Sequence, residues 1–196
     1  MKNKFILATA VMSLVSCTQK EIRVSRSDVS IQKEITGFSP AYIEAGEEGK
    51  PRLNRNNLIG NTHWVLSVDR NLTLKETGIF LQQLAAKKHR SVIHEDTKDI
   101  WFVYSDTLHK NNAYVKMPFT SIALAEPPVY ELSEGVMSLL VRTVSDVKEA
   151  ALHHPDVHTY LLSLDKDMST ETFVNILIEL EKQKAVERVN AEVYIY

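Results

Sequence analysis

The sequence predicts an α+β protein: a single compact domain, built on two βαβ-like repeats, that follows a flexible tether. A strand-turn-helix pattern over residues 64–84 returns ninety-six residues later, over 160–180, and each copy is followed by an aromatic run of strand length. Strands that alternate with amphipathic helices are typical of βαβ units, in which a right-handed crossover joins parallel strands. Between the copies we expect a short meander of strands and one long helix.

The first repeat unit is expected over about 62–105. Residues 63–69 are a compact apolar and aromatic run of strand length, and Arg70 and Asn71 form the turn. Thr73 stands three residues before Glu76, the capping-box spacing in which a hydroxyl and a carboxylate satisfy orphan backbone N–H groups. An apolar helical stripe follows, and residues 100–104 are the second strand. The stripe consists of Ile79, Phe80, Leu81, Leu84 and Ala85.

The second unit is expected over about 158–196. Residues 160–169 match 64–73 in character, with identical Leu, Ser and Asp, and residues 193–196 form the closing aromatic strand. An internal repeat explains this economically, and chance convergence of two βα units is the alternative. The expected helix carries Phe173, Ile176, Leu177 and Leu180 on one face.

The region between the copies holds two expected strands, 113–117 and 120–124, split by Pro118. From Ser133 the apolar spacing becomes helical, which predicts one helix from about Ser133 to His154, ended by Pro155. The alternative is a strand over 138–144 and a helix from Ser145, because Leu139, Val141 and Thr143 also alternate.

The first sixteen residues have the order of an export signal. Lys2 and Lys4 precede an apolar run over 5–15, and small residues follow. A helix that spans a membrane needs about 20 apolar residues, so this run of eleven is too short for a permanent anchor. We therefore expect a signal peptide over 1–16, followed by the mature chain.

Residues 14–17, Leu-Val-Ser-Cys, resemble the lipobox of bacterial lipoproteins. The resemblance implies cleavage before Cys17 and lipidation of this residue with a diacylglycerol thioether and an amide-linked acyl chain such as palmitate, which anchors the protein stably in a bilayer. In the alternative, the signal peptide is ordinary and Cys17 is incidental. Because Thr18 stands where the enterobacterial inner-membrane retention signal has aspartate, the resemblance favours the outer membrane, facing the periplasm.

Composition then narrows the classes of function. Cys17 is the only cysteine, so lipidation would leave no thiol for a disulfide, for catalysis or for a zinc site. Without Lys2 and Lys4 the chain has 21 basic and 25 acidic residues, a net charge of about −4, which gives no reason to expect nucleic acid as a partner. Glycine and proline recur through 17–61, so we expect this lipidated segment to be the flexible tether and 62–196 to be the domain.

Residues 153–158 are the densest set of potential metal ligands, with His154, Asp156 and His158 as the candidates. Pro155 prevents His154 and His158 from standing on one helix face, so we expect a solvated helix end rather than a metal site. No cofactor is expected apart from the covalent lipid on Cys17.

Asp69 and Asp165 occupy equivalent positions in the two units. As catalytic carboxylates they would be symmetric acids at strand ends, but turn-forming residues follow both, so we expect them to accept backbone N–H groups in Asx turns. The sequence contains no nucleophile elbow, Walker loop, dinucleotide glycine pattern or His-Glu-x-x-His motif. No catalytic residue is therefore predicted.

Residues 65–84, and less closely 161–180, resemble the first βα unit of the periplasmic domain of the ExbD/TolR biopolymer-transport family. The resemblance implies an α/β module that binds envelope components, but not proton coupling, because that family has a transmembrane helix with a functional aspartate. We expect a membrane-anchored envelope lipoprotein with a non-catalytic binding or scaffolding role, whose partners are the bilayer and an envelope protein or cell-wall component. The alternatives are a cell-envelope enzyme that uses Asp and His, and a lipoprotein that binds a solute or a metal.

Overall fold

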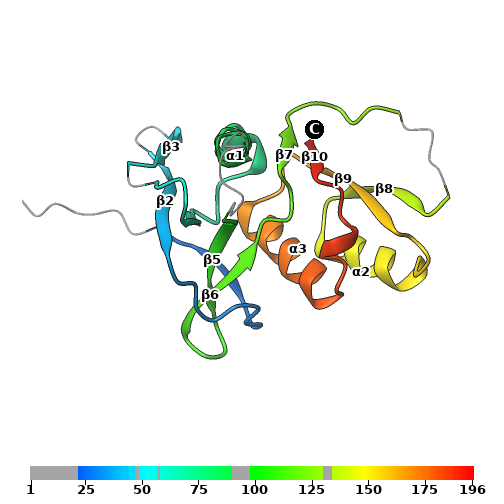
Figure 1. The fold of residues 1–196 in the computed structure, drawn as a ribbon, viewed down its shortest axis with the longest axis horizontal. Coiled ribbons are helices and arrows are strands. Elements are labelled where there is room, and N and C mark those ends of the chain that lie inside the picture. The colour runs from blue at the N-terminus through cyan, green and yellow to red at the C-terminus, as the bar shows by residue number, and fades with distance from the viewer. Residues whose placement is uncertain (1–21, 47–48, 57, 90–97, 130–133) are drawn as a thin grey trace, which may run out of the picture.

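The structure is a computed structural model that describes residues 22–46, 49–56, 58–89, 98–129 and 134–196. Within these ranges the chain forms two β-sheets and three α-helices, which confirms the α+β class (Figure 1). The helices are α1 (Leu74–His89), α2 (Val144–His153) and α3 (Thr170–Lys182), with a short 3₁₀ turn at Val186–Arg188. The strands are β1 (Ser25–Ser27), β2 (Phe38–Ala45), β3 (Pro51–Asn54), β4 (His63–Val68), β5 (Ile100–Asp106), β6 (Asn111–Lys116), β7 (Ser121–Ala123), β8 (Val136–Val141), β9 (Thr159–Leu164) and β10 (Glu192–Ile195).

The first sheet is built around the unit β4-α1-β5. Strand β4 lies between β2 and β5 and is parallel to both, and β3 closes the far side of β2 as an antiparallel strand. β6 lies antiparallel along the other side of β5. The short β1 pairs with residues Tyr104 to Asp106, further along the same side of β5 that β4 occupies at Ile100 to Phe102.

The second sheet is parallel throughout, in the order β7-β10-β9-β8. α2 connects β8 to β9 and α3 connects β9 to β10, so each connection joins neighbouring parallel strands, as a βαβ crossover does. This unit repeats the arrangement of the first: β8, β9, α3 and β10 correspond to β2, β4, α1 and β5.

Helices α1 and α3 join the two halves into one hydrophobic core. α1 also packs against β7 and β10 of the second sheet, while α3 packs against β1 and β6 of the first. Phe102 of β5 meets Phe173 of α3 edge to face at 5.5 Å, and Gly78 lets α1 approach Leu124 and Ile195 closely. Figure 1 shows both helices between the two groups of strands.

Two sequence predictions of local structure are wrong. Residues 17–61 are not a tether throughout, because β1, β2 and β3 belong to the first sheet and Ala41 and Ile43 are fully buried. The domain therefore begins well before residue 62. The single helix expected over 133–154 is instead β8 followed by α2, the alternative that the alternation of Leu139 and Val141 suggested.

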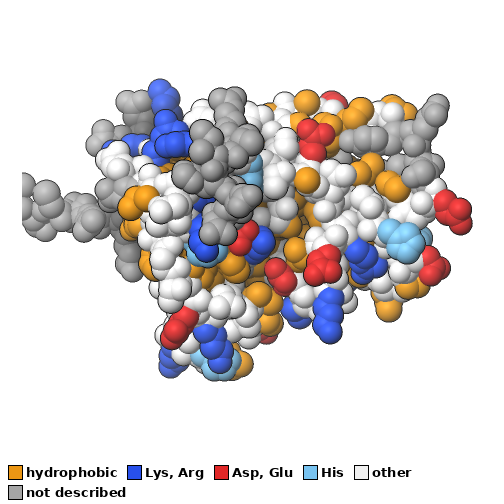
Figure 2. All heavy atoms as spheres, in the orientation of Figure 1, with side chains coloured by type: hydrophobic (Ala, Val, Ile, Leu, Met, Phe, Trp, Pro, Cys, Tyr) orange, Lys and Arg blue, Asp and Glu red, His pale blue; other side chains and the backbone are white. Residues whose placement is uncertain are grey.

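The expected strands around Pro118 are present as β6 and β7. The predicted signal peptide over 1–16 and the lipidation site Cys17 lie outside the described residues. Among the helices that the structure describes, none is long and apolar enough to cross a membrane. Among the described residues visible in Figure 2, acidic and basic side chains are interspersed.

Candidate functional site

The paired acids Asp69 and Asp165 each close a turn between a strand and a helix. Asp69 Oδ1 accepts the Asn71 N–H at 3.1 Å, and Asp165 Oδ1 accepts the Asp167 N–H at 2.8 Å. The backbone hydrogen bonds of the two turns are also equivalent: the Leu72 N–H donates to Asp69 O, and the Met168 N–H donates to Asp165 O. Both are Asx turns, as expected from the residues that follow them.

The two turns also bind each other, and the bonds are reciprocal. The Leu74 N–H donates to Met168 O at 2.9 Å, and its counterpart, the Thr170 N–H, donates to Leu72 O at 2.7 Å. A second pair follows the same pattern, from Lys75 N to Lys166 O and from Glu171 N to Arg70 O. An exchange of equivalent bonds between equivalent residues defines a local twofold axis, and we call this contact, residues 70–75 with 166–171, the seam.

Helix caps stand on both sides of the seam. Glu76 accepts the N–H and the hydroxyl of Thr73 at 2.7 and 2.8 Å, which confirms the predicted capping box. In the second unit, Ser169 Oγ accepts the Thr172 N–H at 3.1 Å. Thr73 and Ser169, one on each side of the seam, are thus engaged in starting α1 and α3.

The N-terminal strand crosses this region and ties it to α3. Arg26 Nε lies 3.0 Å from Glu171 Oε1, and Arg70 Nε lies 3.9 Å from Glu171 Oε2. Asn175 Nδ2 donates to Arg26 O at 3.1 Å. Because the ion pairs are partly exposed, each contributes little to stability, and the effect of the Arg26 pair is chiefly to fix where β1 lies.

A cavity of about 530 Å³ opens beside the first turn, at the carboxyl ends of β2 and β4. Asp69, Glu76 and Arg23 supply its charged groups, with Asn71 as an amide. Ligands of parallel sheets commonly bind at the carboxyl ends of the strands. However, Glu76 is engaged in the capping box and one Asp69 oxygen in the Asx turn, so the cavity offers a small polar solute few uncommitted groups.

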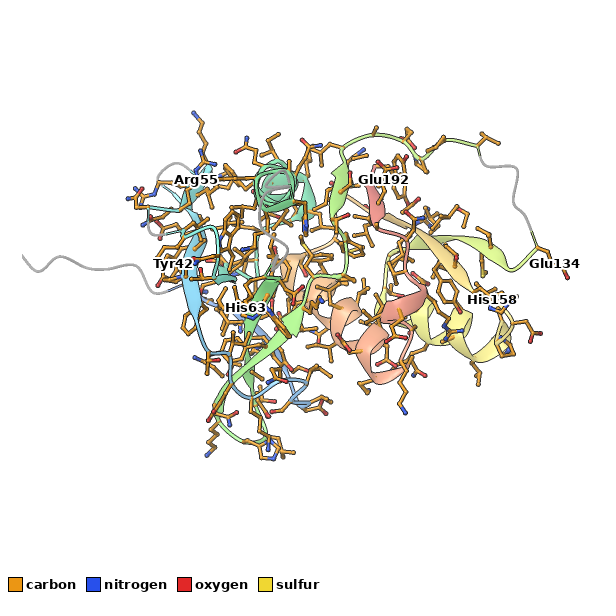
Figure 3. The ribbon with its side chains drawn as sticks, viewed as in Figure 1. Tyr42, Arg55, His63, Glu134, His158 and Glu192 are labelled. Atoms are coloured by element: carbon orange, nitrogen blue, oxygen red, sulfur yellow. The ribbon has the colours of Figure 1, made fainter. Side chains whose placement is uncertain are left out.

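A second cavity, of about 450 Å³, gathers the histidine-rich segment. His154, Asp156 and His158 line it together with His153 and Glu134. Figure 3 shows Glu134 and His158 at the outer end of the second sheet, far along the molecule from His63 of the first. Although the candidate ligands line one cavity, no three His, Cys, Asp or Glu side chains within the described ranges form a group that could hold a metal ion.

The structure also brings together a polar cluster that the sequence did not indicate. Asp106, at the end of β5, is fully buried and accepts hydrogen bonds from the Ser30 hydroxyl and from the backbone N–H groups of Leu108 and His109, both at 2.9 Å. His109 Nδ1 lies 2.7 Å from Asp106 Oδ2. The Ser30 hydroxyl and the His109 N–H hold the pKa of this carboxyl well below its usual range.

This cluster attaches the N-terminal segment to the β5-β6 hairpin. The Tyr104 hydroxyl, next to it, accepts the Ile31 N–H and donates to Val29 O, both at 2.9 Å. The serine bonds directly to the aspartate rather than to the histidine, so the arrangement lacks the order of a catalytic triad. No local pattern could have revealed it, because Ser30 and Asp106 are far apart in the sequence.

Lys88, in the last turn of α1, is another buried charged residue. The residue is 3% exposed, and Nζ donates to Gly60 O at 2.9 Å and to Thr62 O at 2.6 Å. Nζ also lies 4.6 Å from the centre of the Trp64 ring, within range of a cation–π contact. Desolvation lowers the pKa of Lys88, and Asp99 opposes this shift.

In comparisons with known proteins, no family model, no curated protein and no solved structure matches this chain.

Proposed function

We propose that this protein is an envelope lipoprotein, anchored by lipid on Cys17, whose folded domain has a non-catalytic binding or scaffolding role at the periplasmic face of a membrane. The observation that favours a non-catalytic role over a catalytic one is the use of the paired acids. Asp69 and Asp165 hold Asx turns on the two sides of the seam, where catalysis would need them to converge on one substrate.

The short segment between Cys17 and the first strand indicates how close to the bilayer the domain would lie. β1 begins at Ser25, eight residues after the cysteine, and an extended chain spans about 3.3–3.6 Å per residue. The anchor would therefore hold the edge of the domain within about 30 Å of the bilayer surface. A domain kept so close to the membrane is suited to partners that themselves lie at or near it.

The anchor is tested by fractionation of cells that produce the wild-type chain or Cys17→Ser. We expect the wild-type chain in the membrane fraction, with the electrophoretic mobility of an acylated protein, and the variant in the soluble fraction. If Cys17→Ser stays equally membrane-bound, the lipid anchor is wrong. The binding role is tested separately, by crosslinking in cells and identification of the attached proteins or cell-wall fragments.

One observation favours a second role, binding of a small polar solute, namely the cavity beside Asp69. A solute held there would raise the unfolding temperature of the wild-type chain. Asp69→Asn, which keeps the turn acceptor but removes the charge, would abolish that shift for a cationic solute. Metal analysis of the purified protein tests the histidine cavity in the same way.

A further inference from the structure

Strand β8 forms the outer edge of the second sheet (Figure 1). In the part of the chain that the structure describes, its one strand neighbour is β9. The carbonyls of Gly135 and Val141 accept the amides of Thr159 and Asp165, so the odd-numbered residues of β8 face β9. Because backbone groups alternate in direction along a strand, the even-numbered ones direct their N–H and C=O groups to the opposite edge. These are Val136, Ser138 and Leu140.

The first half of the molecule shows how the equivalent edge is covered. β2 corresponds to β8, since Gly37 and Ile43 accept amides of β4 and its turn just as Gly135 and Val141 do. On its outer edge β2 carries β3, which runs antiparallel. Glu44 of β2 faces Arg52 of β3 across this pair, and Arg52 Nε donates to Glu44 Oε1 at 3.0 Å.

The residues of β8 suit an added strand better than those of β2. Met137 and Leu139 pack on the core but remain partly exposed, whereas their counterparts Ser39 and Ala41 are 2% and 0% exposed. Ser138 has an N–H where β2 has Pro40, which has none. β3 pairs only with residues beyond Pro40, whereas β8 has an outward-facing N–H group at each of Val136, Ser138 and Leu140. An apolar edge of this kind recruits another strand.

We propose that two copies of this chain pair through β8, antiparallel and edge to edge, in a dimer whose twofold axis passes at Ser138. This register places Val136 opposite Leu140 and Met137 opposite Leu139 of the second copy. The interface is isologous and closes on itself, as in most homodimers. The proposal goes beyond the binding role above and does not depend on lipid attachment.

Charge complementarity identifies the second copy as the occupant. Glu134 is exposed just before β8, and Arg142, with a side chain 65% exposed, just after it. In the register centred on Ser138, Glu134 of each copy meets Arg142 of the other, so the dimer contains two such pairs. They repeat the Glu44–Arg52 pair with the signs reversed, because Arg142 occupies the position of Glu44.

The groups around Arg142 determine where the backbone hydrogen bonds between the two copies of β8 end. Its N–H donates to Asp146 Oδ2 at 2.7 Å, and its Nε lies 3.9 Å from Asp165 Oδ2. At the other end, Gly135 has a φ of 77°, which turns the chain out of the strand. The backbone ladder therefore runs from Val136 to Leu140, and the charged pairs lie just outside it. Figure 3 shows Glu134 at the outer end of the molecule.

The first experiment is symmetric crosslinking in the full chain with Cys17→Ser, a background that has no other cysteine and no acyl chain. With Ser138→Cys added, mild oxidation should give a disulfide-linked dimer, because the two substituted residues face each other across the axis. Ser145→Cys, on the exposed side of α2, is the matched control and should stay monomeric. Equal crosslinking of both variants, or of neither, overturns the proposal.

The second experiment is a charge exchange, measured by sedimentation equilibrium over a concentration series in the same background. Arg142→Glu or Glu134→Arg should each weaken the dimer about tenfold, since either puts like charges at both ends of the ladder. The double variant should restore the wild-type affinity. Failure of this rescue, or a wild-type chain that is monomeric throughout the series, overturns the proposal.

The third experiment removes the central backbone donor. Ser138→Pro should abolish the dimer, whereas Ser138→Ala should keep it, and Pro40 shows that the equivalent position of β2 accommodates a proline. Circular dichroism establishes that both variants fold. A folded Ser138→Pro variant that still forms dimers shows that the contact lies elsewhere and overturns the assignment to β8.

Discussion

Thr73 and Ser169 face each other in an antiparallel bridge, and they are the equivalent helix-capping residues of the two halves of the chain. Backbone bonds of the seam flank them on both sides. The turns are thus each other's binding partners, and neither half is complete in isolation. This dependence leads to the first prediction.

We expect the two halves to unfold in one transition. Thr170 Oγ1 donates to Leu72 O at 2.8 Å across the seam, and Thr170→Val removes this bond at nearly constant volume, at a cost of about 1 kcal/mol. Both tryptophans, Trp64 and Trp101, lie in the first half. Thr170→Val should lower the urea midpoint by the same amount whether unfolding is followed by tryptophan fluorescence or by circular dichroism. Two separate midpoints would show that the halves are independent.

The turn acids should tolerate amides but not alanine. Asp69→Ala removes the acceptor of the Asn71 N–H and should lower the free energy of unfolding by about 1 kcal/mol, whereas Asp69→Asn keeps an acceptor and should cost less. The same order is expected for Asp165→Ala and Asp165→Asn. Chemical denaturation measures both pairs. If the Asn variants were as unstable as the Ala variants, the carboxylate charge would matter more than the turn.

Lys88 should be far more sensitive to substitution than its neighbour. Lys88→Met leaves the carbonyls of Gly60 and Thr62 without their donor and should destabilise the protein by about 2–3 kcal/mol. Lys87→Met, on the exposed side of α1, is the matched control and should change stability by less than about 0.5 kcal/mol. Thermal unfolding of the two variants provides the comparison.

Asp106 should make the protein sensitive to acid. Its pKa in the folded state is held below the ordinary value of 3.8, so the unfolded chain takes up a proton first as the pH falls. The stabilisation from this group is therefore complete well above pH 4 and is lost as the pH decreases below about 4. The urea midpoint of the wild-type chain should fall over this range, and that of Asp106→Asn should fall less. Parallel pH profiles for the two proteins would contradict this assignment.

The paired glycines before β2 and β8 should differ in their tolerance of a side chain. Gly37 and Gly135 have φ values of 64° and 77°, so alanine at either costs about 1–2 kcal/mol. A Cβ at Gly37 meets open space, but at Gly135 it would lie 2.8 Å from His158 Cδ2. Gly135→Ala should therefore be the more destabilising of the two in chemical denaturation.

The sequence was most informative where side chains carry the structural signal. The apolar stripes, the Thr73–Glu76 spacing and the repeated Leu-Ser-x-Asp segments predicted β4, α1, β9 and α3 and the Asx turns. β2 was missed because Pro40 lies within it and glycines lie on both sides, a composition typical of loops. The helix expected from Ser133 failed because residues 136–144 fit a period of 2 as well as 3.6, and the free edge beside β9 favours the strand.

The seam and the buried polar cluster could not be predicted in this way. Backbone N–H and C=O groups form most of the seam, and every residue except proline has both. The bonds of Asp106 and Lys88 depend on segments that only the folded chain brings together, the first with Ser30 and the second with the carbonyls of Gly60 and Thr62.

The reciprocal contact between the two turns has a consequence for the origin of the chain. A half-length ancestor with one such turn would have had a self-complementary surface, through which two copies could form a homodimer. Fusion of two such genes would convert that association into an intramolecular one and free the outer strands to diverge.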